Sequence, residues 1–298
     1  MTDPIGTMRA GFTGGMYPPP DNIPFDQRAA WQLDRSAKLG ATCLQISDMP
    51  QAPEARQALR VGAEAAGIEI EGLARALFVP LGADPAGRVE ELAHQLDYAS
   101  QIGMTVVRHG WGRLTPQTSR FSPNGDVDAQ KAHIVRCLQT AAPLAEAAKI
   151  PIAVENHCDF GAEELADMLS QVDSEWIGCA LDTANSFTVF RDPNQEIPIL
   201  APLTLTTHIK DMRMIRNPLS WAIPQIPVGC RLGEGQVDLP RTIELLAAHS
   251  PKATGLHLIV EAGWEPEGCP EQVLPPLELR REILESGVAW LNQFIATH

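Results

Sequence analysis

The chain has 298 residues, 44% of them hydrophobic, which suffices to bury a substantial core and argues against extensive disorder. Its 37 acidic and 23 basic residues give a net charge of −14 at neutral pH, and no run of Lys and Arg interrupts this negative field. Because such a field repels DNA and RNA, binding of nucleic acid is disfavoured.

The cysteines and the N-terminal residues are typical of a cytoplasmic protein. No two cysteines form a CxxC pair, and in a chain of this length we expect them to be reduced. They are Cys43, Cys137, Cys158, Cys179, Cys230 and Cys269. The first residues show no basic segment followed by an apolar one, so no signal peptide is expected. No apolar stretch reaches about 18 residues, so no membrane association is expected.

Short apolar runs alternate with amphipathic stretches along the whole chain, which predicts alternating strands and helices. The predicted strands cover residues 8–13, 41–47, 68–73, 106–107, 151–154, 176–181, 203–207 and 255–260. The predicted helices cover residues 28–39, 52–66, 88–102, 128–149, 162–172, 194–200, 239–249 and 276–295, with a long loop before residue 239.

This alternation predicts an α/β protein with one (β/α)₈ TIM-barrel domain over residues 1–298. No segment has the composition of a linker. A doubly wound sheet is disfavoured, because the segment after the first strand reads Gly11-Phe-Thr-Gly-Gly-Met and lacks the G-x-G-x-x-G phosphate loop.

Polar residues follow four consecutive predicted strands: Glu155, Asp182, His208 and Glu261. Singly, each has an ordinary explanation, such as a solvated loop residue, a helix cap or a buried histidine. In a barrel, however, these strand ends converge on one mouth. Three carboxylates there would repel one another, and a divalent cation removes that repulsion. The donor set suits Mn²⁺, Mg²⁺, Co²⁺ or Fe²⁺ better than a structural zinc.

Further candidates lie near the same strand ends. His109 and Trp111 follow the fourth strand, and His157 lies two residues beyond Glu155, so we expect substrate contacts from them. Ordinary packing is the alternative for Trp111. Lys210 and Arg231 are further candidates for substrate binding, although Lys210 has Asp211 beside it as an alternative partner.

The strand-end motifs resemble the xylose-isomerase-like TIM-barrel superfamily of sugar phosphate isomerases and epimerases. The motifs are Val-Glu155-Asn-His157, Leu-Asp182-Thr-Ala-Asn185, His208-Ile-Lys-Asp211, Gly233-Glu-Gly235-Gln-Val-Asp238 and Val-Glu261. In ketose 3-epimerases of this superfamily, a Glu, an Asp, a His and a Glu hold a metal. The resemblance therefore implies that Glu155, Asp182, His208 and Glu261 bind a divalent ion, with Mn²⁺ favoured, and that the two glutamates are the acid–base pair.

Two positions depart from the epimerase pattern. Asn185, a further candidate for substrate binding, occupies a place where many epimerases have a histidine. Gly161 stands where they have a second acidic residue. The departures weaken the assignment to a typical ketose 3-epimerase and leave relatives that process 3-keto sugars or cyclic polyols open.

The expected activity is that of a metal-dependent isomerase or epimerase on a small polyhydroxylated carbonyl compound, a ketose or keto-sugar, through an enediolate. The alternative is a metal-dependent lyase or dehydratase on the same scaffold, acting on an inosose, on dehydroshikimate or on a 3-keto C-glycoside. A phosphodiesterase resembling endonuclease IV is disfavoured, because that relative uses more histidines and acts on a polyanion. Barrels of this kind often pair through their outer helices, so a homo-oligomer is compatible with the resemblance.

Overall fold

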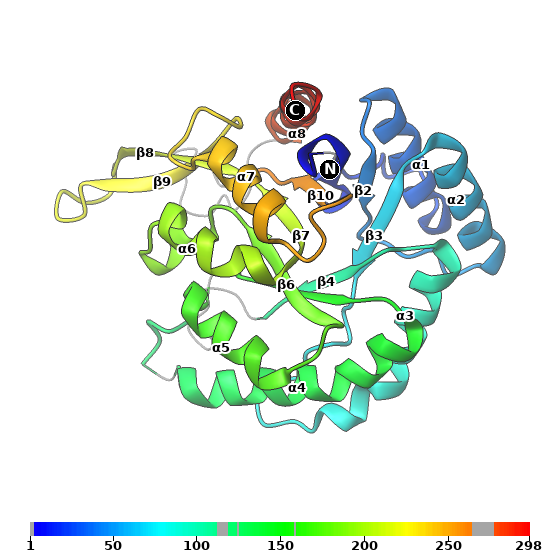
Figure 1. Cartoon of the computed structure of the whole chain (residues 1–298), viewed down its shortest axis with the longest axis horizontal. Coiled ribbons are helices and arrows are strands. Elements are labelled where there is room, and N and C mark those ends of the chain that lie inside the picture. Colours follow the sequence, from blue (N-terminus) through cyan, green and yellow to red (C-terminus); the bar gives the residue numbers. More distant parts are fainter. Residues whose placement is uncertain (1–2, 112–118, 124, 158, 264–276) are drawn as a thin grey trace.

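The computed structural model describes residues 3–111, 119–123, 125–157, 159–263 and 277–298. Eight parallel strands close into a barrel in the order of the chain (Figure 1). They are β1 (Arg9–Thr13), β2 (Cys43–Gln45), β3 (Glu69–Leu73), β4 (Val107–Gly110), β5 (Ile152–Glu155), β6 (Ile177–Asp182), β7 (Thr204–Ile209) and β10 (His257–Val260). This topology confirms the predicted (β/α)₈ barrel.

The α-helices lie around the barrel, as Figure 1 shows. They are α1 (Phe25–Lys38), α2 (Pro53–Ala66), α3 (Val89–Ile102), α4 (Val127–Ala148), α5 (Ala162–Val172), α6 (Pro193–Leu200), α7 (Leu239–His249) and α8 (Leu277–Ala296). Gly67 ends α2 at φ 68° and Gly103 ends α3 at φ 83°, in the left-handed conformation that glycine adopts without strain. In the part of the chain that the structure describes, no helix combines the length and apolar character needed to cross a membrane.

An antiparallel hairpin replaces the long loop expected before residue 239. Its strands are β8 (Asp211–Arg216) and β9 (Gln225–Cys230), and it projects from the barrel at the left of Figure 1. Pro227 lies inside β9 and argues against a strand in the sequence. A two-stranded sheet tolerates it, because each strand has a free edge where no N–H is needed. The hairpin tip exposes Leu219, Trp221 and Ile223.

The barrel interior contains a small apolar cluster and a larger set of buried polar side chains. Side chains alternate along a strand, so every second residue points inward. The apolar cluster consists of Val106, which precedes β4, and of Ala153, Ala180 and Leu205 on β5 to β7. The inward positions of β2, β3, β7 and β10 instead carry buried polar residues that contact one another: Gln45, Glu71, Thr206, His208 and His257.

The cysteines that the structure describes, Cys43, Cys137, Cys179 and Cys230, are buried and free of disulfides. Cys158 and Cys269 lie outside the described residues.

Candidate metal centre

The barrel register brings the four predicted ligands together. Asp182 lies opposite His208 across β6 and β7, and Glu155 lies opposite Ala180 on β6. Glu261 follows β10, and its N–H donates to the carbonyl of Ile209 at 3.0 Å. One ligand atom from each of Glu155, Asp182, His208 and Glu261 lies within 4.8 Å of the other three. We call these four residues the metal cluster.

The imidazole of His208 faces the three carboxylates with one nitrogen only. Its Nδ1 lies 3.5 Å from Glu155 Oε1, 3.4 Å from Glu261 Oε1 and 3.9 Å from Asp182 Oδ2. This buried nitrogen has no hydrogen-bond partner. The opposite nitrogen, Nε2, is 3.0 Å from Gln45 Oε1. A buried ring nitrogen that points at three carboxylates without a hydrogen bond is suited to coordinate a cation.

Two basic side chains also reach the cluster. The guanidinium of Arg108 pairs with Glu155, and Lys210 Nζ lies 2.8 Å from both Asp182 Oδ2 and Glu261 Oε2. Three carboxylates thus meet two fixed positive charges, so the repulsion on which the sequence argument relied is partly relieved without a metal. The features that favour a bound cation are therefore the donor set and the unpaired His208 Nδ1.

Both glutamates are strongly ionised. Burial opposes ionisation, but Arg108 and His208 outweigh it and hold the pKa of Glu155 well below its usual range. For Glu261, Lys210 and His208 outweigh burial in the same way, and its pKa is also far below normal. Both carboxylates are therefore charged and able to bind a cation, but each is a weaker base than an ordinary carboxylate.

The aspartate and the histidine shift in the opposite direction. Burial raises the pKa of Asp182 to about 6, against the attraction of Lys210. Burial lowers the pKa of His208, but the carboxylates of Glu261 and Glu155 outweigh it and raise that pKa to about 9. Without a metal, a proton on Nδ1 thus takes the place that a cation would occupy.

Asp182 acts both as a local cap and as a member of the cluster. Its Oδ1 accepts the backbone N–H groups of Ala184 and Asn185, each at 2.9 Å, which leaves Oδ2 facing the cluster. Asn156 holds the strand end in place. Its side-chain amide donates to the carbonyl of Asp182 at 2.9 Å and accepts the Asp182 N–H at 2.6 Å.

Three other predicted residues lie against the cluster or its neighbours. Asn185 Nδ2 donates to Glu155 Oε1 at 3.2 Å. His157 is close enough to Glu155 to help lower the pKa of that carboxylate. It also packs closely over Gly110, because a Cβ added at position 110 would lie only 3.1 Å from His157 Cβ. His109 stacks on Phe78 with 5.9 Å between ring centroids, and burial together with Arg108 lowers its pKa to about 4. His109 is therefore neutral at physiological pH.

Trp111 and Arg231 have other partners. Trp111 is buried, its ring packs edge-on against Phe78, and its Nε1–H donates to Gln130 Oε1 at 2.9 Å. Arg231 forms ion pairs with the exposed Glu282 and, at 3.7 Å, with Glu234. These contacts give Trp111 a packing role and Arg231 a surface role, and a contact of either with substrate stays a prediction.

Sequence reasoning missed the roles of Arg108 and Gln45. Both are polar residues at inward positions of strands, where an apolar side chain is the norm. A polar residue that interrupts the apolar pattern of a strand could have identified both positions as candidates for the site.

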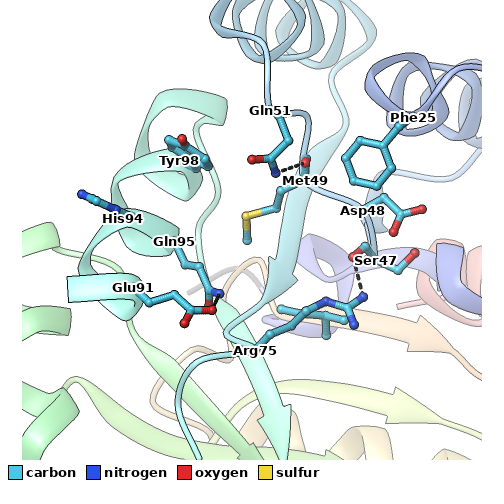
Figure 2. A pocket seen from close by; sticks show the side chains of 11 residues that line it. Phe25, Ser47, Asp48, Met49, Gln51, Arg75, Glu91, His94, Gln95 and Tyr98 are labelled. Atoms are coloured by element: carbon cyan, nitrogen blue, oxygen red, sulfur yellow. Dashed lines mark hydrogen bonds between the residues drawn. The ribbon is translucent and has the colours of Figure 1, made fainter. Parts of the chain in front are cut away.

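A separate cavity of about 530 Å³ lies beside the barrel, between the segment after β2 and helix α3 (Figure 2). Phe25, Met49, Arg75, His94 and Tyr98 are among its lining residues, and Arg75 donates to the carbonyl of Ser47 at 2.8 Å. No member of the metal cluster lines it.

Comparison with known proteins agrees with this architecture. Among solved structures, a xylose isomerase-like TIM barrel protein from Mycobacterium smegmatis in complex with magnesium aligns with a TM-score of 0.72 and 16% identity, covering 98% of each chain. A D-psicose 3-epimerase, solved in the presence of D-fructose, aligns with a TM-score of 0.69 and 15% identity, covering 97% of this chain and 99% of that one. The probable 3-DHS dehydratase from Bacillus anthracis aligns with a TM-score of 0.66 and 14% identity, covering 96% and 99%.

At these identities the structural neighbours demonstrate the fold alone. The chain has no match among curated proteins. Its sequence matches a family profile over residues 33–294, which is most of its length. With that match and the closed barrel, the chain belongs to the xylose isomerase-like TIM barrel family.

Proposed function

We propose that this protein is a divalent-metal-dependent isomerase or epimerase that acts on a ketose or keto-sugar through an enediolate intermediate. The observation that carries the proposal is the position of two ionised glutamates around one imidazole nitrogen. The Oε1 atoms of Glu155 and Glu261 lie 3.5 and 3.4 Å from His208 Nδ1. A reaction that removes a proton from carbon and returns one needs two such groups around a common substrate position.

The residues present fit a metal ion. Glu155, Asp182, His208 and Glu261 would hold it, and Mn²⁺ is the favoured ion because hard oxygen donors with one imidazole suit it. Mg²⁺, Co²⁺ and Fe²⁺ are the alternatives. When bound, the cation supplies Lewis-acid stabilisation of negative charge on the carbonyl and hydroxyl oxygens of the substrate.

The protein's own groups carry the proton transfers. Arg108 keeps Glu155 ionised and does not release its own proton, so Glu155 accepts the proton from the carbon beside the substrate carbonyl. Glu261, which is ionised at rest and paired with Lys210, takes up a proton from solvent and returns it to the substrate. In the reverse direction the two roles are exchanged. Return on the opposite face gives the epimer.

The polar groups around the glutamates fit a polyhydroxylated substrate. Asn185 and His157 lie against Glu155, and His109 on β4 is held neutral, so each can exchange hydrogen bonds with substrate hydroxyls. The names of the neighbouring epimerase structures support a sugar as the substrate class.

A lyase or dehydratase is the second candidate, and Lys210 favours it. An ammonium 2.8 Å from both Glu261 and Asp182 offers a charged hydrogen-bond donor, and these carboxylates raise its pKa above the usual lysine value, so it stays protonated. If the carbanion expelled a β-hydroxyl instead of recovering a proton, the proton taken from carbon would leave with that oxygen as water, and Lys210 would hydrogen-bond to the leaving oxygen.

The test is a substrate screen in D₂O with Mn²⁺-loaded protein, using ketohexoses, 3-keto sugars and inososes. We expect deuterium to enter the carbon next to the carbonyl, detected by NMR, and to stop entering with EDTA until Mn²⁺ is restored. Epimer formation supports the first candidate, and loss of water with formation of an enone supports the second. If the metal-loaded protein catalyses neither exchange nor elimination on any of these compounds, both candidates fail.

A further inference from the structure

A chain of buried hydrogen bonds leads from the metal cluster into the barrel. Gln45 Oε1 lies 3.0 Å from His208 Nε2, and Gln45 Nε2 donates to Glu71 Oε1 at 2.5 Å. The other oxygen of Glu71 accepts from Thr206 Oγ1 at 2.6 Å and lies 2.9 Å from His257 Nδ1. All five side chains are buried, and they come from four different strands.

The chain continues to the opposite end of the barrel. His257 Nε2 lies 3.0 Å from Glu69 Oε2, and Glu69 Oε1 lies 2.6 Å from Arg9 Nε. Arg9 and Glu69 are each about one-third exposed, so the chain ends at solvent.

Glu71 is ionised in spite of its burial. Burial raises the pKa of a carboxyl group, but the hydrogen bonds and charge of His257 outweigh it, with help from Thr206 and Gln45, and the pKa of Glu71 falls below its usual value. An ionised carboxylate can only accept hydrogen bonds, so the group that faces it must be a donor.

This requirement determines how the amide of Gln45 is oriented. Its NH₂ must face Glu71, so its oxygen faces His208 Nε2 and also Arg108 Nε, which lies 3.3 Å away. Turned over, the amide would set its oxygen against a carboxylate and its NH₂ against two other donors. His208 must therefore carry its proton on Nε2, which leaves the lone pair of Nδ1 for the cluster.

We propose that Gln45 and Glu71 are positioning residues of the metal centre: Glu71 orients the amide of Gln45, and Gln45 holds His208 in the tautomer that coordinates through Nδ1. The inference rests on the proposed metal centre and adds two residues that lie outside the four proposed ligands. Gln45 cannot relay a proton as a carboxylate or water would, so the chain positions His208 without conducting protons. Partners of this kind typically change metal affinity by about 10–100-fold.

The test measures Mn²⁺ affinity by electron paramagnetic resonance, without substrate, in four variants. Gln45→Met removes the acceptor at similar volume. Glu71→Gln allows the Gln45 amide to turn over, which favours the wrong tautomer. We expect each to weaken Mn²⁺ binding about 10–100-fold. Thr204→Val is the matched control. Thr204 is equally buried on β7, but its hydroxyl donates to the carbonyl of Leu200 and takes no part in the hydrogen-bond chain that leads to His208. Thr204→Val should bind Mn²⁺ like the wild type.

The fourth variant exchanges the two residues, Gln45→Glu with Glu71→Gln. Every hydrogen bond can then re-form: Glu at position 45 accepts from His208 and Arg108, while Gln at position 71 donates to it and accepts from Thr206 and His257. We expect the exchange to restore affinity to within a few-fold of the wild type. A merely structural role for either residue would not give this rescue.

Nitrogen-15 spectra of the histidine rings, recorded without metal above the His208 pKa of about 9 so that the ring is neutral, provide a second readout, with His208 assigned from a His208→Asn variant. We expect a proton on Nε2 of His208 in the wild type and its loss from that nitrogen in Glu71→Gln. If folded Gln45→Met and Glu71→Gln bind Mn²⁺ as tightly as the wild type, or if the exchange does not rescue them, the positioning role is overturned. If the wild type binds no Mn²⁺, the proposed function fails, and the ring spectra alone then decide the tautomer assignment.

Discussion

Lys210 Nζ lies 2.8 Å from Glu261 Oε2, inside the cluster that is proposed to hold a metal. The same nitrogen is 2.8 Å from Asp182 Oδ2, and the lysine is almost fully buried. The ammonium therefore neutralises two of the proposed ligands from one side. A bound cation would share their charge, so lysine and metal would stabilise the same carboxylates.

Replacing this lysine should expose that shared role. Lys210→Met leaves Asp182 and Glu261 buried without their basic partner, and breaking a buried ion pair costs about 3–5 kcal/mol. We expect a large loss of thermal stability in EDTA and a larger stabilising shift on adding Mn²⁺ than in the wild type, measured by calorimetry. Lys38→Met, which removes only an exposed pair with Asp34, should change stability by less than about 1 kcal/mol. Equal Mn²⁺ shifts in the Lys210 variant and the wild type would contradict this prediction.

The two glutamates should be needed for proton transfer as well as for binding the metal. Glu155→Gln and Glu261→Gln keep an oxygen ligand and nearly the same volume but cannot accept a proton. General acid–base groups contribute about 10²–10⁴-fold, so solvent deuterium should enter the substrate slower by that factor while Mn²⁺ stays bound. Glu163→Gln, on the exposed face of α5, is the control. Near-normal deuterium exchange in both variants would contradict this assignment, and the general base would then be sought among His157, His109 and Lys210.

His257 should make stability depend on pH in the alkaline range. Burial lowers its pKa, but the hydrogen bonds that His257 donates to Glu69 and Glu71 outweigh this and raise it to about 9, against 6.5 for an unperturbed histidine. The charge-dependent stabilisation is thus complete below pH 6.5 and is lost as the pH rises through about 9. We expect the gap in unfolding free energy between the wild type and His257→Gln to narrow over this window, by at most about 1.4 kcal/mol per pH unit. Urea unfolding from pH 6 to 10 measures it. A constant gap would rule this out.

Trp111 should act in packing and not in substrate binding. Trp111→Phe keeps most of the contact with Phe78 but removes the hydrogen bond that Trp111 Nε1–H donates to Gln130 Oε1. Loss of a buried hydrogen bond costs about 0.5–1.5 kcal/mol, so the melting temperature should fall while KM for the substrate found in the screen stays unchanged. A raised KM with unchanged stability would instead restore the substrate contact predicted from the sequence.

The sequence alone determined the barrel and the four members of the cluster. Strand and helix periods are local properties, so the order of elements can be read along the chain. In a parallel barrel of sequential strands, all carboxyl ends meet at one mouth. Glu155, Asp182, His208 and Glu261 therefore had to converge, whatever the detailed packing. The hairpin of β8 and β9 was not predicted from the sequence, because the proline-containing strand β9 is stabilised by its pairing with β8 and not by a local pattern.

Only the tertiary structure decided what surrounds the cluster. Arg108 and Lys210 look in the sequence like other polar residues near strand ends, and which carboxylate each pairs with depends on the register of strands far apart in the chain. Gln45, Glu71 and His257 lie within strands and have no local motif. Glu71 contacts both Gln45 and His257 because the three side chains point into the barrel from β2, β3 and β10, and the closure of the barrel brings those strands together. Hydrogen bonds act over about 3 Å, so strand closure and register, which no single segment encodes, select these partners.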